Sequence, residues 1–182
     1  MKEIFPEPPL IAYKRQRNIG DKIIRAKVTP NIPYPKRNIT GMKKCQKQCH
    51  VCPYIQERKS VKSGKFTWSI NNHVDCTTEN IIYLIQCDKE YCKENKYIGE
   101  SEREFHERLN EHRGYIYRKD MRYATGEHFN QPGHNLSNMK ATILEKVTSH
   151  DPLYRKEREK YFIRKFNSYH KGMNRSPGVG SS

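Results

Sequence analysis

Two short apolar runs, each carrying one tyrosine, stand close together near the middle of the chain. Residues 81–85 read IIYLI and residues 96–99 read KYIG, so that Tyr83 and Tyr97 hold comparable places in the two runs. Compact runs of this composition are typical of β-strands. The ten residues between them are few enough for a hairpin-like connection. The pattern therefore predicts two strands that pair through a loop.

An amphipathic helix is predicted directly after the second run. Ser101 and Glu104 have the spacing of a capping box, and the helix should continue to about Tyr117. The face that we expect to be buried carries Phe105, Leu109 and Ile116. Arg108 and His112 are one turn apart and lie near that face. A cation and an imidazole beside two tyrosines are suited to contact a phosphate.

The C-terminal part predicts a third strand and a second amphipathic helix. Residues 141–147 (ATILEKV) alternate enough for a strand. Asp151 followed by Pro152 is typical of an N-cap with proline at the first helical position, and Gly172 is expected to end the segment. Basic residues of the helix should face outward, and the residues expected to be buried are Leu153, Tyr154, Tyr161, Phe162 and Phe166.

This helix carries only two acids, Glu157 and Glu159. Glu159 lies about one turn before Phe162 and therefore beside the expected buried stripe. Most glutamates on charged helices are solvated, so the residues alone favour a surface role for both acids.

The amino-acid composition indicates that the protein binds a polyanion. The 182 residues carry a formal net charge of +15 with a pI near 9.6, and 12 of them are tyrosine. Basic surfaces with interspersed aromatic groups suit nucleic acid, although a basic protein that is merely soluble is the alternative. With 34% hydrophobic and 30% charged residues, we expect one modest core that needs a staple. No stretch is apolar enough to span a membrane and no leader marks secretion, so the six cysteines are expected to bind metal.

The cysteines form two groups. The first has the pattern Cys-x3-Cys-x2-Cys, followed after a polar stretch by one further cysteine: Cys45, Cys49, Cys52 and Cys76. Close thiolate pairs joined by a loop to a further ligand predict a structural tetrahedral zinc site. His50 and His73 are possible substitute ligands, and free thiols or a disulfide are the alternative interpretation.

The second group combines thiols and imidazoles. Cys87 and Cys92 lie between the two tyrosine runs, while His128 and His134 follow the first predicted helix with a Pro-Gly turn between them. Two cysteines and two histidines complete a tetrahedral zinc set with no open position for chemistry. Two surface thiols and two unrelated histidines are the alternative.

The chain is expected to divide into four segments. Residues 1–44 form a basic arm with six prolines, or the remnant of an upstream domain, in which residues 21–28 could form one short helix or strand. Residues 45–79 are a cysteine-rich linker, residues 80–174 the main domain, and residues 175–182 a flexible tail.

The order IIY, YIG and Arg-x3-His resembles the GIY-YIG nuclease superfamily. Glu159 and the Asn174 of KGMN resemble the family's closing glutamate and asparagine. The cysteine pair and the downstream histidines look like the endonuclease domain of Penelope-like retroelements, in which this domain follows a reverse transcriptase. The N-terminal arm resembles the end of that polymerase region. Ile81 stands where the family name has glycine, which removes no reactive group.

The resemblance implies an α+β fold with a small, mostly antiparallel three-stranded sheet, flanking helices, zinc-stapled insertions and an extended arm. It also implies hydrolysis of a DNA phosphodiester, with Glu159 holding one Mg²⁺ or Mn²⁺. Tyr83 or Tyr97 would be the general base, and because a free tyrosine has a pKa of about 10, the metal and the nearby arginine would have to lower it.

The other polar residues have implied roles as well. Arg108 would hold the phosphate oxygens with its planar fork, and His112 would orient the attacking water or contact the phosphate. Asn174 would position Glu159 or the backbone without reacting. The implied partners are DNA, the reverse-transcriptase part of the same polyprotein and its template RNA, in the nucleus and without a membrane. The alternatives are a zinc-stapled binding module without cleavage activity, and a repair or homing nuclease of the same superfamily, against which the Cys87 group argues.

Overall fold

The computed structural model describes residues 40–178 except 48 and 93. The element expected at residues 21–28, and the arm up to residue 39, lie outside the described residues. Within the described part of the chain, no helix is both long and apolar enough to cross a membrane.

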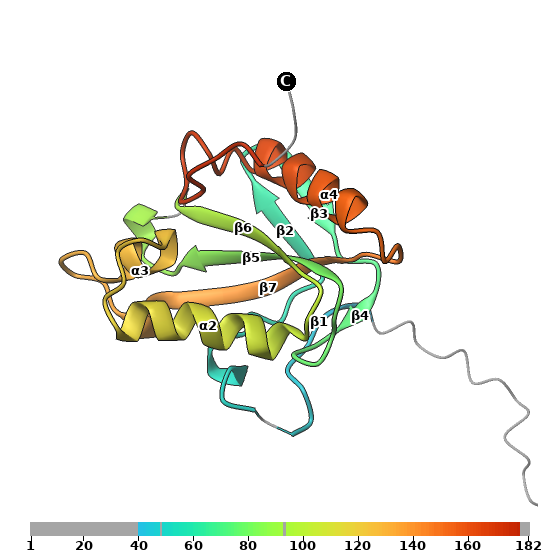
Figure 1. Ribbon diagram of the computed structural model, residues 1–182, viewed down its shortest axis with the longest axis horizontal. Coiled ribbons are helices and arrows are strands. Elements are labelled where there is room, and N and C mark those ends of the chain that lie inside the picture. Colours follow the sequence, from blue (N-terminus) through green and yellow to red (C-terminus); the bar gives the residue numbers. More distant parts are fainter. Residues whose placement is uncertain (1–39, 48, 93, 179–182) are drawn as a thin grey trace, which may run out of the picture. The chain divides into compact units, whose positions relative to one another are not determined.

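A three-stranded antiparallel sheet is the centre of the fold (Figure 1). Its order is β6-β5-β7, with β5 (Ile81–Cys87) between β6 (Lys96–Ser101) and β7 (Met139–Lys146). All residues of β5 except Gln86 are buried, since both faces of the sheet are covered. Tyr83 is paired with Gly99 on one side and with Ile143 on the other. The two predicted tyrosine strands and the third strand are confirmed.

Helix α2 (Phe105–Tyr117) buries the predicted face, but the predicted capping box is wrong. Ser101 is the last residue of β6 and pairs with Ile81, and its hydroxyl donates to the Arg103 carbonyl at 3.0 Å. Glu104 is the N-cap, and its side chain makes no capping hydrogen bond. Because the strand continues through Ser101, the chain needs a turn before the helix can begin.

Helix α4 (Pro152–Lys165) begins as predicted: the carboxylate of its N-cap, Asp151, accepts a 2.9 Å hydrogen bond from the Leu153 backbone N–H. The prediction for its buried face is partly wrong, because Leu153 is 70% exposed and Tyr154 is 42% exposed. The inner stripe instead runs from Phe166 and Phe162 back through Glu159 to Arg155, which is 4% exposed. The prediction that the basic residues of this helix face outward is therefore wrong for Arg155.

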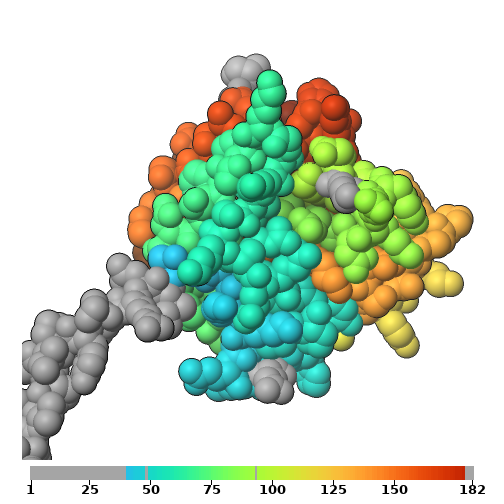
Figure 2. Space-filling model, turned by 180° about the vertical axis from the view of Figure 1, so that it is seen from behind, coloured from blue at the N-terminus to red at the C-terminus, as the bar shows by residue number. Residues whose placement is uncertain are grey.

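The residues before the sheet are more structured than a linker. Strands β1 (Gly41–Met42) and β4 (His73–Val74) pair in parallel, and β2 (Ser60–Ser63) and β3 (Phe66–Ser69) form an antiparallel hairpin. Trp68 of this hairpin donates to the Leu144 carbonyl at 2.8 Å and meets Phe162 edge-on at 4.8 Å. In Figure 2 this part of the chain covers much of the face seen from behind. It shares one core with the sheet.

Four shorter helices complete the described fold. The α-helix α3 (Ala124–Phe129) follows α2, and three 3₁₀ helices lie in the connections: η1 (Cys52–Tyr54), η2 (Glu90–Cys92) and η3 (Leu136–Asn138). Helices α2 and α3 pack together, while α4 packs against β6 and β5.

Candidate active site

A chain of hydrogen bonds joins the first tyrosine strand to α2 and α3. Arg108 Nε donates to the Tyr83 hydroxyl at 3.0 Å, and that hydroxyl lies 2.8 Å from His112 Nε2. The other ring nitrogen, His112 Nδ1, lies 2.9 Å from Thr125 Oγ1. No sequence pattern indicated Thr125, which stands in a helix of six residues outside the tyrosine runs. All but Arg108 are buried.

The direction of these bonds follows from their donors. Arg108 has no acceptor atom, so the Tyr83 oxygen accepts from it and its own hydrogen is available for His112 Nε2. His112 then carries its proton on Nδ1 and donates to Thr125. Burial, with the nearby Arg108 charge, lowers the pKa of His112 to about 3, so the ring is neutral at physiological pH. His112 is thus a fixed, uncharged acceptor for the Tyr83 proton.

The second tyrosine lies beside the first because Gly99 leaves room. Tyr83 and Tyr97 have ring centroids 6.3 Å apart, and the ring of Tyr97 lies 5.3 Å from that of His112. A Cβ on Gly99 would fall 2.5 Å from the Tyr83 hydroxyl oxygen and 2.9 Å from the Tyr97 ring. Glycine is therefore required here for space, whatever its backbone conformation.

The pKa values of both tyrosines are raised, whereas a general base would need a lowered pKa. Burial, and then the neighbouring Tyr97, raise the pKa of Tyr83 well above its usual value. Burial also raises the pKa of Tyr97. Arg108 acts in the expected direction on both pKa values, but its effect is the smaller one. In the protein alone, both phenols are held protonated.

Glu111 positions the arginine from the next turn of α2. Its carboxylate accepts from Arg108 Nη1 at 2.5 Å and also from Arg103. A guanidinium fixed at two points, Tyr83 and Glu111, presents its remaining N–H groups in a set direction. Sequence reasoning missed Glu111, although its i,i+3 spacing from Arg108 is the signal that could have found it.

Glu159 of α4 lies near enough to the same polar cluster to interact with it electrostatically. Burial and the nearby Glu100 carboxylate raise the pKa of Glu159 to about 7, while Arg108 opposes that change. Its charge also acts on both tyrosines. Among the described residues no side chain or backbone group gives the Glu159 carboxylate a hydrogen bond or an ion pair. A half-buried carboxylate that lacks a partner and lies near a second carboxylate fits a divalent cation.

A buried arginine lies beneath this carboxylate. Arg155 Nε donates to Glu100 at 2.5 Å, and Arg155 Nη1 donates to the Asn80 side chain at 2.7 Å. Asn80 in turn donates to the carbonyls of Val147 and Ser149, each at 2.7 Å. These bonds join the residues next to the start of β5 and the end of β7 to α4, and so tie the helix that carries Glu159 to the sheet. No sequence pattern indicated this network.

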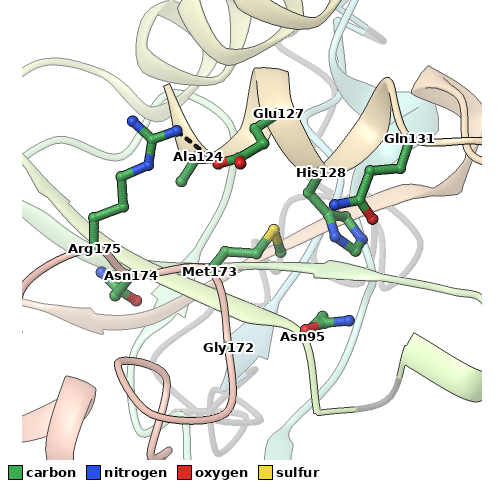
Figure 3. A pocket seen from close by; sticks show the side chains of 9 residues that line it. All are labelled: Asn95, Ala124, Glu127, His128, Gln131, Gly172, Met173, Asn174 and Arg175. Atoms are coloured by element: carbon green, nitrogen blue, oxygen red, sulfur yellow. Dashed lines mark hydrogen bonds and ion pairs between the residues drawn. The ribbon is translucent and has the colours of Figure 1, made fainter. Parts of the chain in front are cut away.

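Asn174 binds the free edge of β6. Its Oδ1 accepts from the Ile98 N–H and its Nδ2 donates to the Ile98 carbonyl, both at 2.8 Å. The Met173 N–H adds a 2.9 Å bond to the Lys96 carbonyl. Figure 3 shows this segment facing α3 across a hollow of about 290 Å³, with Arg175 bound to Glu127. In this structure Asn174 contacts the backbone of the second tyrosine strand.

The predicted Cys₂His₂ set comes together as a group. The ligand atoms of Cys87, Cys92, His128 and His134 all lie within 4.8 Å of one another. Cys92 Sγ is 3.1 Å from His134 Nε2, and the buried His128 Nε2 has no hydrogen-bond partner among the described residues. An orphaned imidazole nitrogen in a thiol-containing group fits zinc, which would satisfy it. His128 also lines the hollow in Figure 3.

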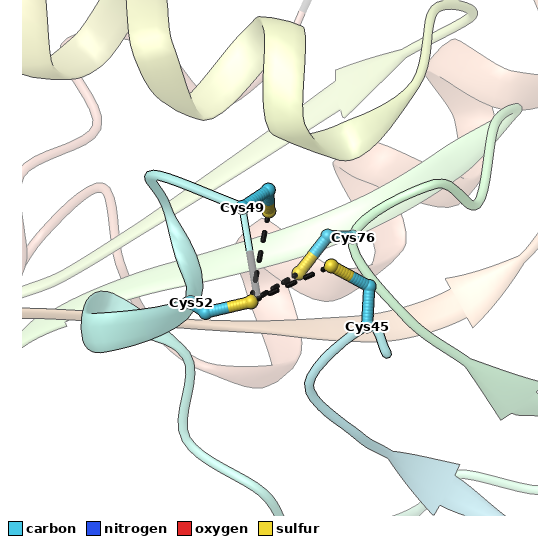
Figure 4. Close-up of side chains that lie close together, drawn as sticks. All are labelled: Cys45, Cys49, Cys52 and Cys76. Carbon is cyan, nitrogen blue, oxygen red and sulfur yellow. Dashed lines mark hydrogen bonds between the residues drawn. The ribbon is translucent and has the colours of Figure 1, made fainter. Parts of the chain in front are cut away.

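The four cysteines of the first group also converge (Figure 4). Cys52 Sγ lies 3.5 Å from Cys45 Sγ, 3.6 Å from Cys49 Sγ and 3.7 Å from Cys76 Sγ. All are free thiols, and these spacings far exceed the roughly 2 Å of a disulfide. Zn–S bonds of about 2.3 Å give tetrahedral edges of roughly 3.8 Å, so the spacings fit one zinc ion.

Comparison with known proteins points to one family. The model of the family described as GIY-YIG catalytic domain matches residues 79–174, which is just over half of the chain. Neither the curated proteins nor the solved structures include a match.

Proposed function

Because this chain belongs to the GIY-YIG nuclease family, we propose that it cuts DNA by metal-assisted hydrolysis at the site around Tyr83. Nucleases of this family hydrolyse phosphodiester bonds, and DNA is the substrate that the family implies. The observation that most directly supports the proposal is the hydrogen-bonded chain of Arg108, Tyr83 and His112, with the unpartnered Glu159 near it.

Arg108 is the group for the phosphate. Its guanidinium is anchored by Glu111 on one side and by the Tyr83 hydroxyl on the other. Its charge is therefore aimed before substrate arrives, and the charge that develops on the phosphate oxygens is stabilised without reorganisation. Lysine could not make both contacts from one planar fork.

Glu159 is the residue that would hold Mg²⁺ or Mn²⁺. A bound divalent cation supplies Lewis-acid stabilisation of the phosphate and a more acidic water. The protein's own contribution is a carboxylate without a protein partner among the described residues, on a helix that the Arg155–Glu100 pair, one turn earlier, ties to β6. Carboxylate oxygen is the ligand type that these hard cations prefer.

The two tyrosines are the candidates for the general base. The Tyr83 hydroxyl donates a hydrogen bond to neutral His112, which holds the phenol oxygen in a fixed direction. Tyr97 instead meets His112 ring to ring, with centroids 5.3 Å apart. Tyr83 is therefore the better placed of the two for proton transfer from the attacking water, and His112 acts by receiving the Tyr83 hydrogen bond.

The two zinc groups have a structural role in this proposal. Each has four protein ligands and so leaves no position for water or substrate. The Cys87 group ties the end of β5 and the loop between the tyrosine strands to α3 and to His134 after it, and the Cys45 group ties the first three cysteines to Cys76, which lies between β4 and β5. Both hold the reacting residues in register.

We also propose that the chain is the endonuclease part of a Penelope-like retroelement protein that nicks chromosomal DNA in the nucleus to prime reverse transcription. The Cys₂His₂ group within a GIY-YIG domain supports this, as does the basic charge of +15. Its partners would then be the reverse transcriptase of the same polyprotein and the template RNA. A binding module without cleavage activity is the second candidate, favoured by the same basic charge.

Nicking of supercoiled plasmid with Mg²⁺ tests the proposal. We expect wild type to nick, Glu159→Ala to lose nicking, and Glu157→Ala to behave as wild type, because Glu157 is the exposed acid on the same helix. Equal nicking by wild type and Glu159→Ala would remove the metal-ligand role. Plasmid binding without nicking by any protein would support the binding module.

A further inference from the structure

A pair of stacked tyrosines lies at the C-terminal end of α2. The rings of Tyr115 and Tyr123 are 3.6 Å apart between centroids and only 4° from parallel. Tyr115 covers one face of the Tyr123 ring, yet Tyr123 remains 43% exposed. Tyr123 thus keeps aromatic surface that a ligand can reach.

Several hydrogen bonds hold the backbone around this tyrosine pair. Arg175 donates to the carbonyls of Arg122 and Met121 at 2.6 and 2.7 Å, and the Asp120 N–H donates to the Tyr115 carbonyl at 2.9 Å. The next helix approaches so closely that a Cβ on Gly126 would fall 2.1 Å from the Asp120 oxygen. The backbone that carries Tyr123 is therefore held in place, and its ring is stacked on Tyr115.

The surroundings of the ring pair are basic. Residues 113–123 contain four basic side chains and one acid, Asp120, which is already paired with Arg122 at 2.8 Å. The guanidinium carbon of Arg118 lies 5.9 Å from the centroid of the Tyr115 ring. Flat aromatic rings in a segment with an excess of cations complement a nucleotide, which offers a base to stack on and a phosphate to pair with.

The tyrosine pair is also next to the candidate active site. Arg108, His112 and Tyr115 follow one another along α2 at helical spacing, and the rings of His112 and Tyr115 are 5.9 Å apart. Tyr123 stands two residues before Thr125, which binds His112. A nucleotide on the rings would therefore be close to a phosphate held by Arg108.

We propose that Tyr115 and Tyr123 form a stacking platform for an unpaired base of the DNA substrate, next to the phosphate that is cut. Bases within a duplex have their faces covered by neighbouring pairs, so the platform can be used only where the duplex is open or a base has turned out of it. The inference rests on the proposed function and adds to it a preference for DNA with unpaired bases.

Fluorescence anisotropy with two labelled DNA probes tests the platform. The probes are a short duplex and the same duplex with a gap of unpaired nucleotides, measured without added Mg²⁺ or Mn²⁺ so that neither is cut. We expect wild type to bind the gapped probe more tightly. Since stacking of one base contributes about 1–3 kcal/mol, Tyr123→Leu should weaken gapped-probe binding about 5- to 100-fold. Duplex binding should change less than about twofold, as phosphate contacts dominate it.

Two further variants control for general effects. Tyr123→Trp should keep the preference, because it retains a stacking ring. Tyr154→Leu removes an equally exposed tyrosine (42%) at the start of α4 and should leave both affinities unchanged. Equal binding of both probes by wild type, or an equal loss on both probes for Tyr123→Leu, would overturn the platform. Plasmid nicking by the same preparation separates the two hypotheses: nicking without probe preference refutes only the platform, and probe preference without nicking refutes only the cleavage function.

Discussion

Replacing Asn174 with alanine should destabilise the protein before it affects the chemistry. The substitution removes both hydrogen bonds to Ile98 and leaves an N–H and a carbonyl unpaired on the edge of β6. A hydrogen bond contributes about 0.5–1.5 kcal/mol net. Because the site is only half-buried and water can partly replace the amide, we expect a loss of about 2 kcal/mol in the free energy of unfolding.

Chemical denaturation of the zinc-loaded protein measures this loss. The chain has one tryptophan, Trp68, which packs against Phe162 of α4, so its fluorescence reports the packing of that helix on the hairpin. A loss of about 2 kcal/mol should lower the melting temperature by roughly 4–8 °C in a chain of this size. Asn174→Asp, which keeps the acceptor for the Ile98 N–H and loses the donor, should show an intermediate loss.

The nicking rate of Asn174→Ala shows whether this residue takes part in the reaction. Well below the melting temperature of either protein, we expect Asn174→Ala to retain most of its nicking rate. Loss of a group that transfers a proton or holds the reacting phosphate costs about 100-fold or more. A loss of that size, together with an unchanged melting temperature, would show that Asn174 takes part in the reaction and that its backbone contacts are secondary.

Three further outcomes are expected. Gly99→Ala should abolish most nicking, because its Cβ would push the Tyr83 ring away from His112, and full activity would show that the ring can move freely. The pKa of Glu159 is raised to about 7 in the folded protein, so without Mg²⁺ its ionisation destabilises the fold increasingly as the pH rises from about 4.5 to about 7. Glu159→Gln should therefore be more stable than wild type at pH 8 but not at pH 4.5. Chemical denaturation at the two pH values measures the difference. Zinc analysis should give two ions per chain, falling to one in Cys92→Ser with a lower melting temperature, and a ratio near zero in wild type would reject both groups.

The strands and helices of the sheet domain could be predicted because their signals are local. A run of β-branched residues around Tyr83 and an Asp-Pro start at Asp151 depend on a few neighbours only. The capping box failed because Ser101 had two local possibilities, and pairing with Ile81 across the sheet decided between them. The hairpin around Trp68 could not be predicted, since its polar sequence gains stability only from contact with Leu144 and Phe162.

The candidate site shows the same division. A motif can name residues such as Tyr83, Arg108 and Glu159, but it contains no information on what holds them. Thr125 and Arg155 are found only when α3 and α4 are placed against the sheet. The pKa of Tyr83 likewise depends on how completely the fold removes water, which the sequence does not express.

The two glycines in the family's name are not equivalent in this chain. At the first, Ile81 takes the place of glycine, and its side chain packs entirely into the core at 0% exposure, so that position does not require glycine. At the second, Gly99 lies directly across the ladder from Tyr83, and the missing side chain is the volume through which the phenol of the neighbouring strand reaches His112. Among variants at these two positions, active proteins should therefore carry various apolar residues at position 81 but only glycine at position 99.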